Sequence, residues 1–563
     1  MFVSRQWVVA AIAICCQWVP LVAMANQPPS ESTVGVATEN GATNHPSNIS
    51  RGVLVVCPDV FRTTLQPWIQ RREAEGLKVH VIPSRPTYPQ LHADLVSAYL
   101  ELPSARYVML VGDCPLSSDG RAVDPTRQIP TGYPSTDVTR LYQSTPELAS
   151  DFSFGDFDDD GIADAAVGRL PVQNQRQLQD LITRIFLYED SVDVGDWRNR
   201  IQLVAGVGGF GFLADTAIET VTRSLVTTAV PAQNNVSITY AGPDSPFCPP
   251  GSFHQRVMQD YAAGCRFWVY AGHGAVDQLD RVNDSGDGIM RSVMTNQDAQ
   301  RLESKAGCFP IAFLVACYTG AFDARTDCLA ERMLRSPGGP IAVLCGSRVT
   351  MPYGNACIML GLISSIFHPD PNQRAKRLGD AWLAASAQTR QETIENPAIK
   401  TQRMLIDNIA KIMSRDASLI DEERIEHTRL YNWLGDPTLR LHQEQSIDVS
   451  APRRASPGSE IDVAFSLPTT GQFRVQLHRV IGNVPRPDRS LNNPSIETPL
   501  DRHRHHNQTL VKSWTFDVQE TRVPIEQTLR LPDDVRGVML LKAYLVNQPN
   551  RQRASGVKRI VIR

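Results

Sequence analysis

The sequence lacks any surplus of positive charge. It contains 56 lysines and arginines against 59 aspartates and glutamates, which gives a net charge of −3 at pH 7. Binding to phosphates normally needs a basic face, so this balance argues against a nucleic acid as an obligatory partner. Charged residues make up 20% and hydrophobic residues 42% of the chain, which is ordinary for a globular protein with a sizeable core.

Beyond its N-terminus the sequence has no apolar run long enough to span a bilayer. Residues 1–25 combine the positive charge of MFVSR, an apolar stretch and the small-x-small triplet Ala23-Met24-Ala25, which is the pattern of a cleaved signal peptide. A membrane anchor is the alternative, but the interruption QWVP and the polar NQPPSEST that follows favour removal. We expect an exported protein with no stable membrane insertion.

Cysteines are scattered and show no paired spacing of the metal-binding kind. Two of the eleven, Cys15 and Cys16, lie in the predicted signal, which leaves nine (11 − 2). An odd number leaves at least one thiol outside any intramolecular disulfide scheme. The sequence does not show which thiol stays free.

Composition divides the rest of the chain into three parts. Residues 26–50 are polar and rich in Ser, Thr, Asn and Pro, as in a linker or short propeptide. From 51 to 445, short apolar runs alternate with helical periods, which predicts an α/β fold around a mostly parallel sheet, with a subdomain boundary near 195. Residues 446–563 read as short alternating strands, which predicts an immunoglobulin-like β-sandwich.

Two apolar runs of the α/β part end in reactive side chains. The run FWVYAGHG ends with His273 between two glycines, and the run PIAFLVACYTG contains Cys317 directly after its apolar residues. Ligands bind beyond the carboxyl ends of parallel strands, and neighbouring strands lie ~4.8 Å apart. If the two strands are neighbours, an imidazole and a thiol meet at one edge of the sheet.

That pair of groups has a chemical use. An imidazole can take the proton of a thiol and later protonate a leaving amine. Gly272 and Gly274 permit a sharp turn, and the N–H groups of Gly274 and Cys317 are candidates for an oxyanion hole. Taken singly, a strand-end cysteine is usually a core residue and a histidine between glycines usually belongs to a turn. The combination is what favours catalysis.

The run DFDDDGIAD predicts a cation site. It places carboxylates at alternate positions on a loop, with a glycine that permits a tight turn, and such a loop suits a hard cation with oxygen ligands. A solvated acidic loop is the alternative, because the bidentate glutamate of a full EF-hand is missing. We expect a structural Ca²⁺ ion, and its candidate ligands are Asp156, Asp158, Asp160 and Asp164.

Two further patterns are weaker. GVGGFG at 206–211 fits the dinucleotide-binding fingerprint, but no acidic residue follows at the expected distance, so a tight strand-to-helix turn is the plainer interpretation. HRHH at 503–506 lies in a polar loop, where solvated side chains are more ordinary than a metal site.

Several ordered motifs resemble one family. GHG after an apolar strand, followed by ACYTGAFDARTDCLAERML and GPIAVLCGS, resembles the gingipain-type cysteine peptidases. Three other segments resemble the same family: LVVCPDVFRTTLQPWIQRREAEGLKVHVI, FGDFDDDGIADAAVGRLPV and YNWLGDPTLRL. The resemblance covers 51–445 and implies the caspase-like fold, followed by an immunoglobulin-like domain.

The resemblance also implies a function and site residues. It implies a cysteine endopeptidase that acts on proteins or peptides, with Cys317 as nucleophile and His273 as general base and acid. The family's acidic residue that can orient the histidine matches Asp164, for which a strand start or a calcium ligand is the alternative role. Related peptidases are stabilised by calcium, and no cofactor is expected for catalysis. Cys328 is expected in the core.

Other interpretations stay open. A non-catalytic exported module on the same fold is the main rival, and an NAD-linked enzyme would depend on GVGGFG alone. Family members are known for cutting after Arg or Lys. Asp277 and Asp280 are the acids that follow His273, but a solvated loop is the plainer account, and the family's tryptophan after GHG is missing from AVDQLDRV.

Overall fold

The computed structural model describes most of the chain from residue 51 onward. The residues left out are 1–50, 116–121, 192, 209–211, 243–244, 246, 250, 284–287, 392–393, 395, 415, 481–506 and 520–523. The predicted signal, the polar segment to residue 50 and HRHH therefore lie outside the described residues. In the part that is described, no helix has both the length and the apolar character needed to cross a membrane.

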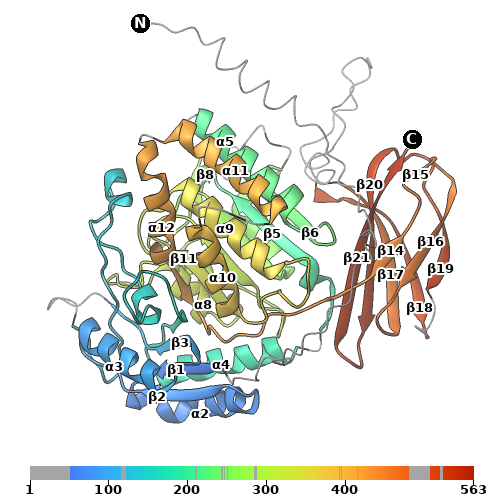
Figure 1. Ribbon diagram of the computed structural model, residues 1–563. Coiled ribbons are helices and arrows are strands. Elements are labelled where there is room, and N and C mark those ends of the chain that lie inside the picture. The colour runs from blue at the N-terminus through green and yellow to red at the C-terminus, as the bar shows by residue number, and fades with distance from the viewer. Residues whose placement is uncertain are drawn as a thin grey trace, which may run out of the picture. The chain divides into compact units, whose positions relative to one another are not determined.

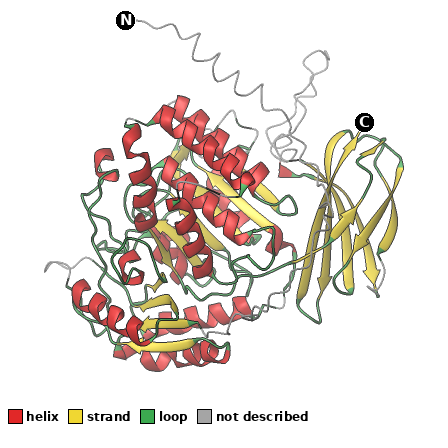
Figure 2. Ribbon diagram, viewed as in Figure 1, coloured by secondary structure: helices red, strands yellow, loops and turns green. Residues whose placement is uncertain are grey.

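A ten-stranded sheet forms the centre of the first part, in the order β2-β1-β3-β4-β12-β11-β10-β7-β5-β6. Its strands are apolar because both faces are covered by helices (Figures 1 and 2). The strands are β1 (Gly52–Val56), β2 (Lys78–Ile82), β3 (Ala105–Val111), β4 (Ala166–Leu170), β5 (Arg200–Ala205), β6 (Asn235–Tyr240), β7 (Phe267–Ala271), β10 (Ile311–Val315), β11 (Ala342–Gly346) and β12 (Tyr431–Leu434).

The strand β12 reverses the direction of the sheet. It pairs parallel with β4 but antiparallel with β11, while the other pairs of the sheet are parallel. The two halves of the sheet therefore run in opposite directions. As a result, the carboxyl ends of β7 and β10 lie at the same edge as the amino end of β4. The chain passes from the first half to the second between β4 and β5 and returns to the first half at β12, and the boundary near 195 stays a prediction.

Successive residues of the strands face opposite helical layers. Val53 and Val55 belong to a core shared with α2 and α4, whereas Leu54 and Val56 belong to a core shared with α3. Since the central strands bury both faces, they read as continuous apolar runs, whereas the edge strands β2 and β6 are only partly buried. The helices are α2 (Asp59–Ala74), α3 (Tyr88–Glu101), α4 (Gln175–Glu189), α5 (Phe212–Ser224), α6 (Phe253–Ala262), α7 (Asn296–Ala299), α8 (Leu329–Arg335), α9 (Pro352–Ile366), α10 (Leu378–Arg390), α11 (Pro397–Met413) and α12 (Ile420–Leu430).

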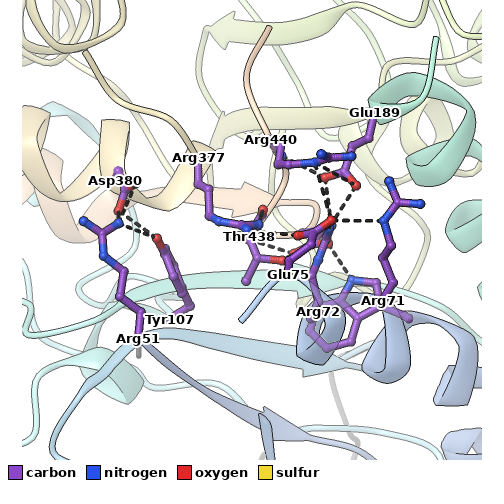
Figure 3. A network of polar contacts seen from close by, with 12 residues as sticks. Arg51, Arg71, Arg72, Glu75, Tyr107, Glu189, Arg377, Asp380, Thr438 and Arg440 are labelled. Carbon is purple, nitrogen blue, oxygen red and sulfur yellow. Dashed lines mark hydrogen bonds and ion pairs between the residues drawn. The ribbon is translucent and has the colours of Figure 1, made fainter. Parts of the chain in front are cut away.

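The closing segment YNWLGDPTLRL is tied to α2 by buried polar contacts. Asp436 accepts hydrogen bonds from Arg72 (2.7 Å) and from the indole N–H of Trp68 (2.6 Å). Arg72 also pairs with Glu189 of α4 at 2.9 Å, inside the network of Figure 3. The motif therefore has a structural role, because it joins the end of the α/β part to its first helix.

The C-terminal part consists largely of antiparallel strands around its own core (Figure 2). The larger sheet has the order β13-β21-β20-β17-β18, with β15 beside β21, and the smaller one has the order β14-β16-β19. This arrangement agrees with the expected immunoglobulin-like domain. The strands are β13 (Gln445–Ser446), β14 (Asp448–Ser450), β15 (Arg454–Ala455), β16 (Glu460–Ser466), β17 (Gly471–Arg479), β18 (Leu510–Val518), β19 (Ile525–Arg530), β20 (Gly537–Asn547) and β21 (Gln552–Ile562).

Candidate active site

The strands that carry the predicted histidine and cysteine are direct neighbours. β7 and β10 pair in parallel with Ala271 opposite Val315, and the Gly272 N–H donates to the carbonyl of Val315 at 3.3 Å. His273 and Cys317 each follow two residues after this last pair. The expectation that the two strands lie side by side is therefore confirmed, and both residues leave the sheet at one edge.

The two loops touch at Gly274. A Cβ atom added there would lie 2.7 Å from the carbonyl oxygen of Cys317 and 2.9 Å from the Cβ of Ala316. Only glycine fits such an approach without displacing the neighbouring backbone. Gly274 therefore lets the loop that follows β7 and carries His273 (the histidine loop, residues 272–280) pack against the loop that follows β10 and carries Cys317 (the cysteine loop).

The half-buried imidazole of His273 contacts a backbone carbonyl. Its Nε2 atom lies 2.8 Å from the carbonyl oxygen of Gly208, in the turn after β5. A carbonyl can only accept, so this hydrogen bond requires the proton on Nε2. In the neutral ring Nδ1 then keeps its lone pair and is the nitrogen that can take up a proton.

Cys317 is partly exposed, unlike most other thiols. The nine cysteines of the described chain are all free, and only Cys248 and Cys317 are not buried. Burial raises the pKa of Cys57 and of Cys114 to about 12, which leaves these core thiols protonated and inert. Cys328 is fully buried, as expected.

A backbone N–H supports the sulfur atom of Cys317. The N–H of Thr350, in the loop after β11, donates to Sγ at 3.3 Å. The next residue, Tyr318, has a φ of 57°, a left-handed conformation that side chains other than glycine rarely adopt. Local strain of this kind is concentrated at functional sites.

Asp164 does not lie beside His273. It precedes β4 at the shared edge, but β12, β11 and β10 separate β4 from β7. Four steps of ~4.8 Å place the two residues about 19 Å apart along the sheet, beyond hydrogen-bond reach. Its carboxylate instead accepts the N–H of Phe157 at 3.0 Å. The role of orienting His273, which the motif implied for Asp164, is therefore not supported.

The acidic loop brings three of the four predicted cation ligands together. Oxygen atoms of Asp156, Asp158 and Asp164 all lie within 4.8 Å of one another. Asp160 is outside this group, and its carboxylate accepts the N–H of Ile162 at 2.7 Å. Gly161 has a φ of +80°, so the tight turn expected at this glycine is present.

Asp156 supplies an independent reason to expect an ion. It is 5% exposed, and its Oδ1 atom is buried with no hydrogen-bond partner among the described residues. Burial and the neighbouring aspartates raise the pKa of this carboxyl group. A buried oxygen of this kind fits a bound cation, and the donor set of carboxylates fits calcium.

A second acidic group was not predicted from the sequence. Oxygen atoms of Asp113, Asp327 and Glu331 also lie within 4.8 Å of one another. Arg335 fills the position of a cation, because it pairs with Asp327 at 3.1 Å and with Glu331 at 2.8 Å. The group is therefore an internal ion cluster. Asp327, Glu331 and Arg335 lie on or just before α8, but Asp113 is distant in sequence, so no local pattern marks the whole group.

The comparisons with known proteins agree with this geometry. The fold and its strand-edge thiol and imidazole define the class of caspase-like α/β proteins. The model of "Peptidase family C25" matches residues 47–442, more than half of the chain, and the chain belongs to this gingipain family of cysteine peptidases. No curated protein matches the sequence significantly.

Solved structures show the same fold at low identity. The chain is similar to the Arg-specific cysteine proteinase gingipain R, with 15% identity over 91% of this chain and 98% of that one, at a TM-score of 0.52. It is also similar to a complex of the pro- and mature domains of RgpB from Porphyromonas gingivalis, with 15% identity over 91% and 100% of the two chains, at a TM-score of 0.51.

Proposed function

We propose that the protein is an exported cysteine endopeptidase in which Cys317 is the nucleophile and His273 the general base and acid. The pairing of β7 with β10 is the observation that carries this proposal, because it brings a partly exposed thiol and an imidazole to one edge of the sheet. Membership in a cysteine peptidase family supports it. The substrates are proteins or peptides.

The reaction follows from these groups. His273 takes the thiol proton, and Cys317 Sγ bonds to the carbonyl carbon of the scissile peptide. The N–H groups of Gly274 and Cys317 are the proposed donors to the oxyanion. The C–N bond then breaks, and the proton on His273 passes to the leaving amine. Water hydrolyses the thioester and restores the thiol. This chemistry needs no metal.

The test is cleavage of a peptide library by the purified protein. Cys317→Ala and His273→Ala should each lower kcat/KM by a factor of about 10³ or more, as for members of other nucleophile–base pairs. Cys248→Ala is the matched control, because it removes the other thiol that is not buried. Wild-type activity that survives in Cys317→Ala would contradict the proposal.

The rival is a binding or assembly module on the same fold. Mass spectrometry after iodoacetamide separates the two interpretations. A peptidase should be modified at Cys317 first, with loss of activity in step. Equal modification of several thiols in a protein that cleaves no peptide would favour the module.

We also propose that the loop 156–164 binds a structural Ca²⁺ ion through Asp156, Asp158 and Asp164. The closeness of the three carboxylates and the unpartnered oxygen of Asp156 support this proposal. Asp160 completes the sequence pattern but is placed outside the group. The ion would hold the loop, which lies apart from the thiol and the imidazole.

We propose that residues 1–25 direct export and are then removed. The support is the sequence pattern of a charged start, an apolar stretch and a small-x-small triplet. N-terminal sequencing of the mature protein should begin at or after Asn26. Sequencing also tests whether 26–50 is removed as a propeptide.

A further inference from the structure

The histidine loop is held by a carboxylate that the reaction itself does not use. Asp280 precedes the hairpin of β8 (Arg281–Asn283) and β9 (Met290–Ser292). Its Oδ2 atom accepts the N–H of Val207 at 3.0 Å. Val207 is the neighbour of Gly208, whose carbonyl contacts His273. Asp280 thus fixes the backbone segment that supplies the acceptor for the imidazole.

Tyr270 connects the same carboxylate residue to His273 itself. Its fully buried hydroxyl group donates to the carbonyl oxygen of His273 at 2.9 Å and accepts the N–H of Asp280 at 3.1 Å. Both ends of the histidine loop are therefore fixed to one phenol.

Two glycines make room for these contacts. A Cβ atom at Gly206 would collide with the carboxylate of Asp280, and one at Gly272 would lie 2.7 Å from the hydroxyl oxygen of Tyr270. The glycine-rich run after β5 thus has a local purpose unrelated to a dinucleotide. It lets a carboxylate and a phenol approach the backbone beside His273.

We propose that Asp280 and Tyr270 are positioning residues for His273. Together they hold the segment 206–208 in place. The carbonyl of Gly208 in this segment then fixes the imidazole with its proton on Nε2. This inference rests on the proposed peptidase function. A backbone carbonyl orients the ring here, and it can do so only if its own loop is fixed. The carboxylate of Asp280 supplies a charge-assisted hydrogen bond for that purpose.

The test compares kinetic constants of substituted proteins. Asp280→Ala and Tyr270→Phe should each lower kcat by a factor of about 10 to 100 with little change in KM, because a misplaced base slows proton transfer. Asp280→Asn should restore part of the activity. Its amide oxygen can still accept the Val207 N–H, whereas its amide nitrogen cannot accept the Arg281 N–H that Oδ1 accepts at 2.9 Å. The rate of Cys317 alkylation against pH should change in parallel in the first two variants.

Two control variants remove similar contacts far from His273. Asp193→Ala removes a carboxylate that holds the Gly195 N–H at 2.7 Å, and Tyr261→Phe removes a buried hydroxyl that donates to Gly338 at 3.2 Å. Both should lower the melting temperature without changing kcat. Losses of kcat that merely track melting temperature, or no recovery in Asp280→Asn, would overturn the inference. A wild-type protein without activity would instead refute the proposed function.

Discussion

A single buried carboxylate, that of Asp436, joins the closing turn of the α/β part to its first helix. It is fully buried and accepts hydrogen bonds from Trp68 and Arg72 of α2 and from Thr438 in its own turn, whose N–H lies at 2.7 Å. Buried charges are stable only when they are paired and hydrogen-bonded. Figure 3 shows the surrounding arginines and glutamates that complete the network.

Asp436→Ala should therefore destabilise the protein strongly. It removes one partner of a buried pair and leaves the indole N–H and part of the guanidinium unsatisfied, a change that typically costs about 3–5 kcal/mol. Urea unfolding followed by circular dichroism measures the loss. Asp59→Ala is the control, because it breaks an exposed pair with Arg62, which is usually worth less than about 1 kcal/mol. A loss below that figure for Asp436→Ala would contradict the structural role of the motif.

At this scale the sequence revealed side chains but not their partners. His273 and Cys317 could be selected because each ends an apolar run. The groups that contact them, the Gly208 carbonyl and the Thr350 N–H, belong to the backbone. Every residue carries such groups, so no residue type marks them. The motif assigned Asp164 to His273. The strand order, which the sequence does not reveal, places the two residues on strands that are not neighbours.

Among the elements, the loop 156–164 has a composition that matches its geometry. The alternation of aspartates and the glycine predicted four clustered carboxylates, and the structure clusters three of them, Asp156, Asp158 and Asp164, without Asp160. Most strands were also predictable, because runs such as GVLVVC are apolar throughout. The reversal at β12 was not, because a four-residue strand carries no signal for its direction. Strand direction depends on contacts between residues far apart in sequence.

Calcium should stabilise the protein through this loop. Excess Ca²⁺ should raise the melting temperature, and EGTA should lower it, since a ligand that binds only the folded state stabilises that state. Asp156→Asn should abolish most of the shift, because it weakens the most buried ligand. Asp160→Asn should preserve most of it. Differential scanning fluorimetry with and without metal checks both, and a shift that survives in Asp156→Asn would place the ion elsewhere.

For the molecule as a whole, buried polar contacts join the α/β part to the β-sheet part. Lys542 of β20 is 4% exposed, and its Nζ atom donates to the carbonyl of Asn234 and to Oδ1 of Asn235, both at 2.8 Å. Tyr544 donates to the carbonyl of Gln233 at 2.6 Å. These contacts involve the start of β6, the edge strand of the large sheet. Folding of the two parts should therefore be coupled.

Lys542 should make stability depend on pH. Burial lowers the pKa of its amine to about 7, against an ordinary value near 10.5. Between these values the unfolded chain binds more protons than the folded one, so this residue makes stability rise with pH from about 7 to 10, by at most about 1.4 kcal/mol per pH unit. Below pH 7 the amine is charged in both states, and its contribution no longer changes.

The variant Lys542→Met tests whether this residue makes stability depend on pH, because a methionine side chain cannot titrate. The free energy of unfolding of wild type minus that of the variant, measured in urea at several pH values, should rise between pH 7 and 10. Thiols and tyrosines titrate in the same range, but they do so in both proteins and cancel in the difference. Lys512→Met is the control, because it removes a partly exposed lysine of β18 whose Nζ atom donates to the carbonyl of Arg530 at 2.7 Å. A flat difference for Lys542→Met would mean that the buried amine titrates as it does in water.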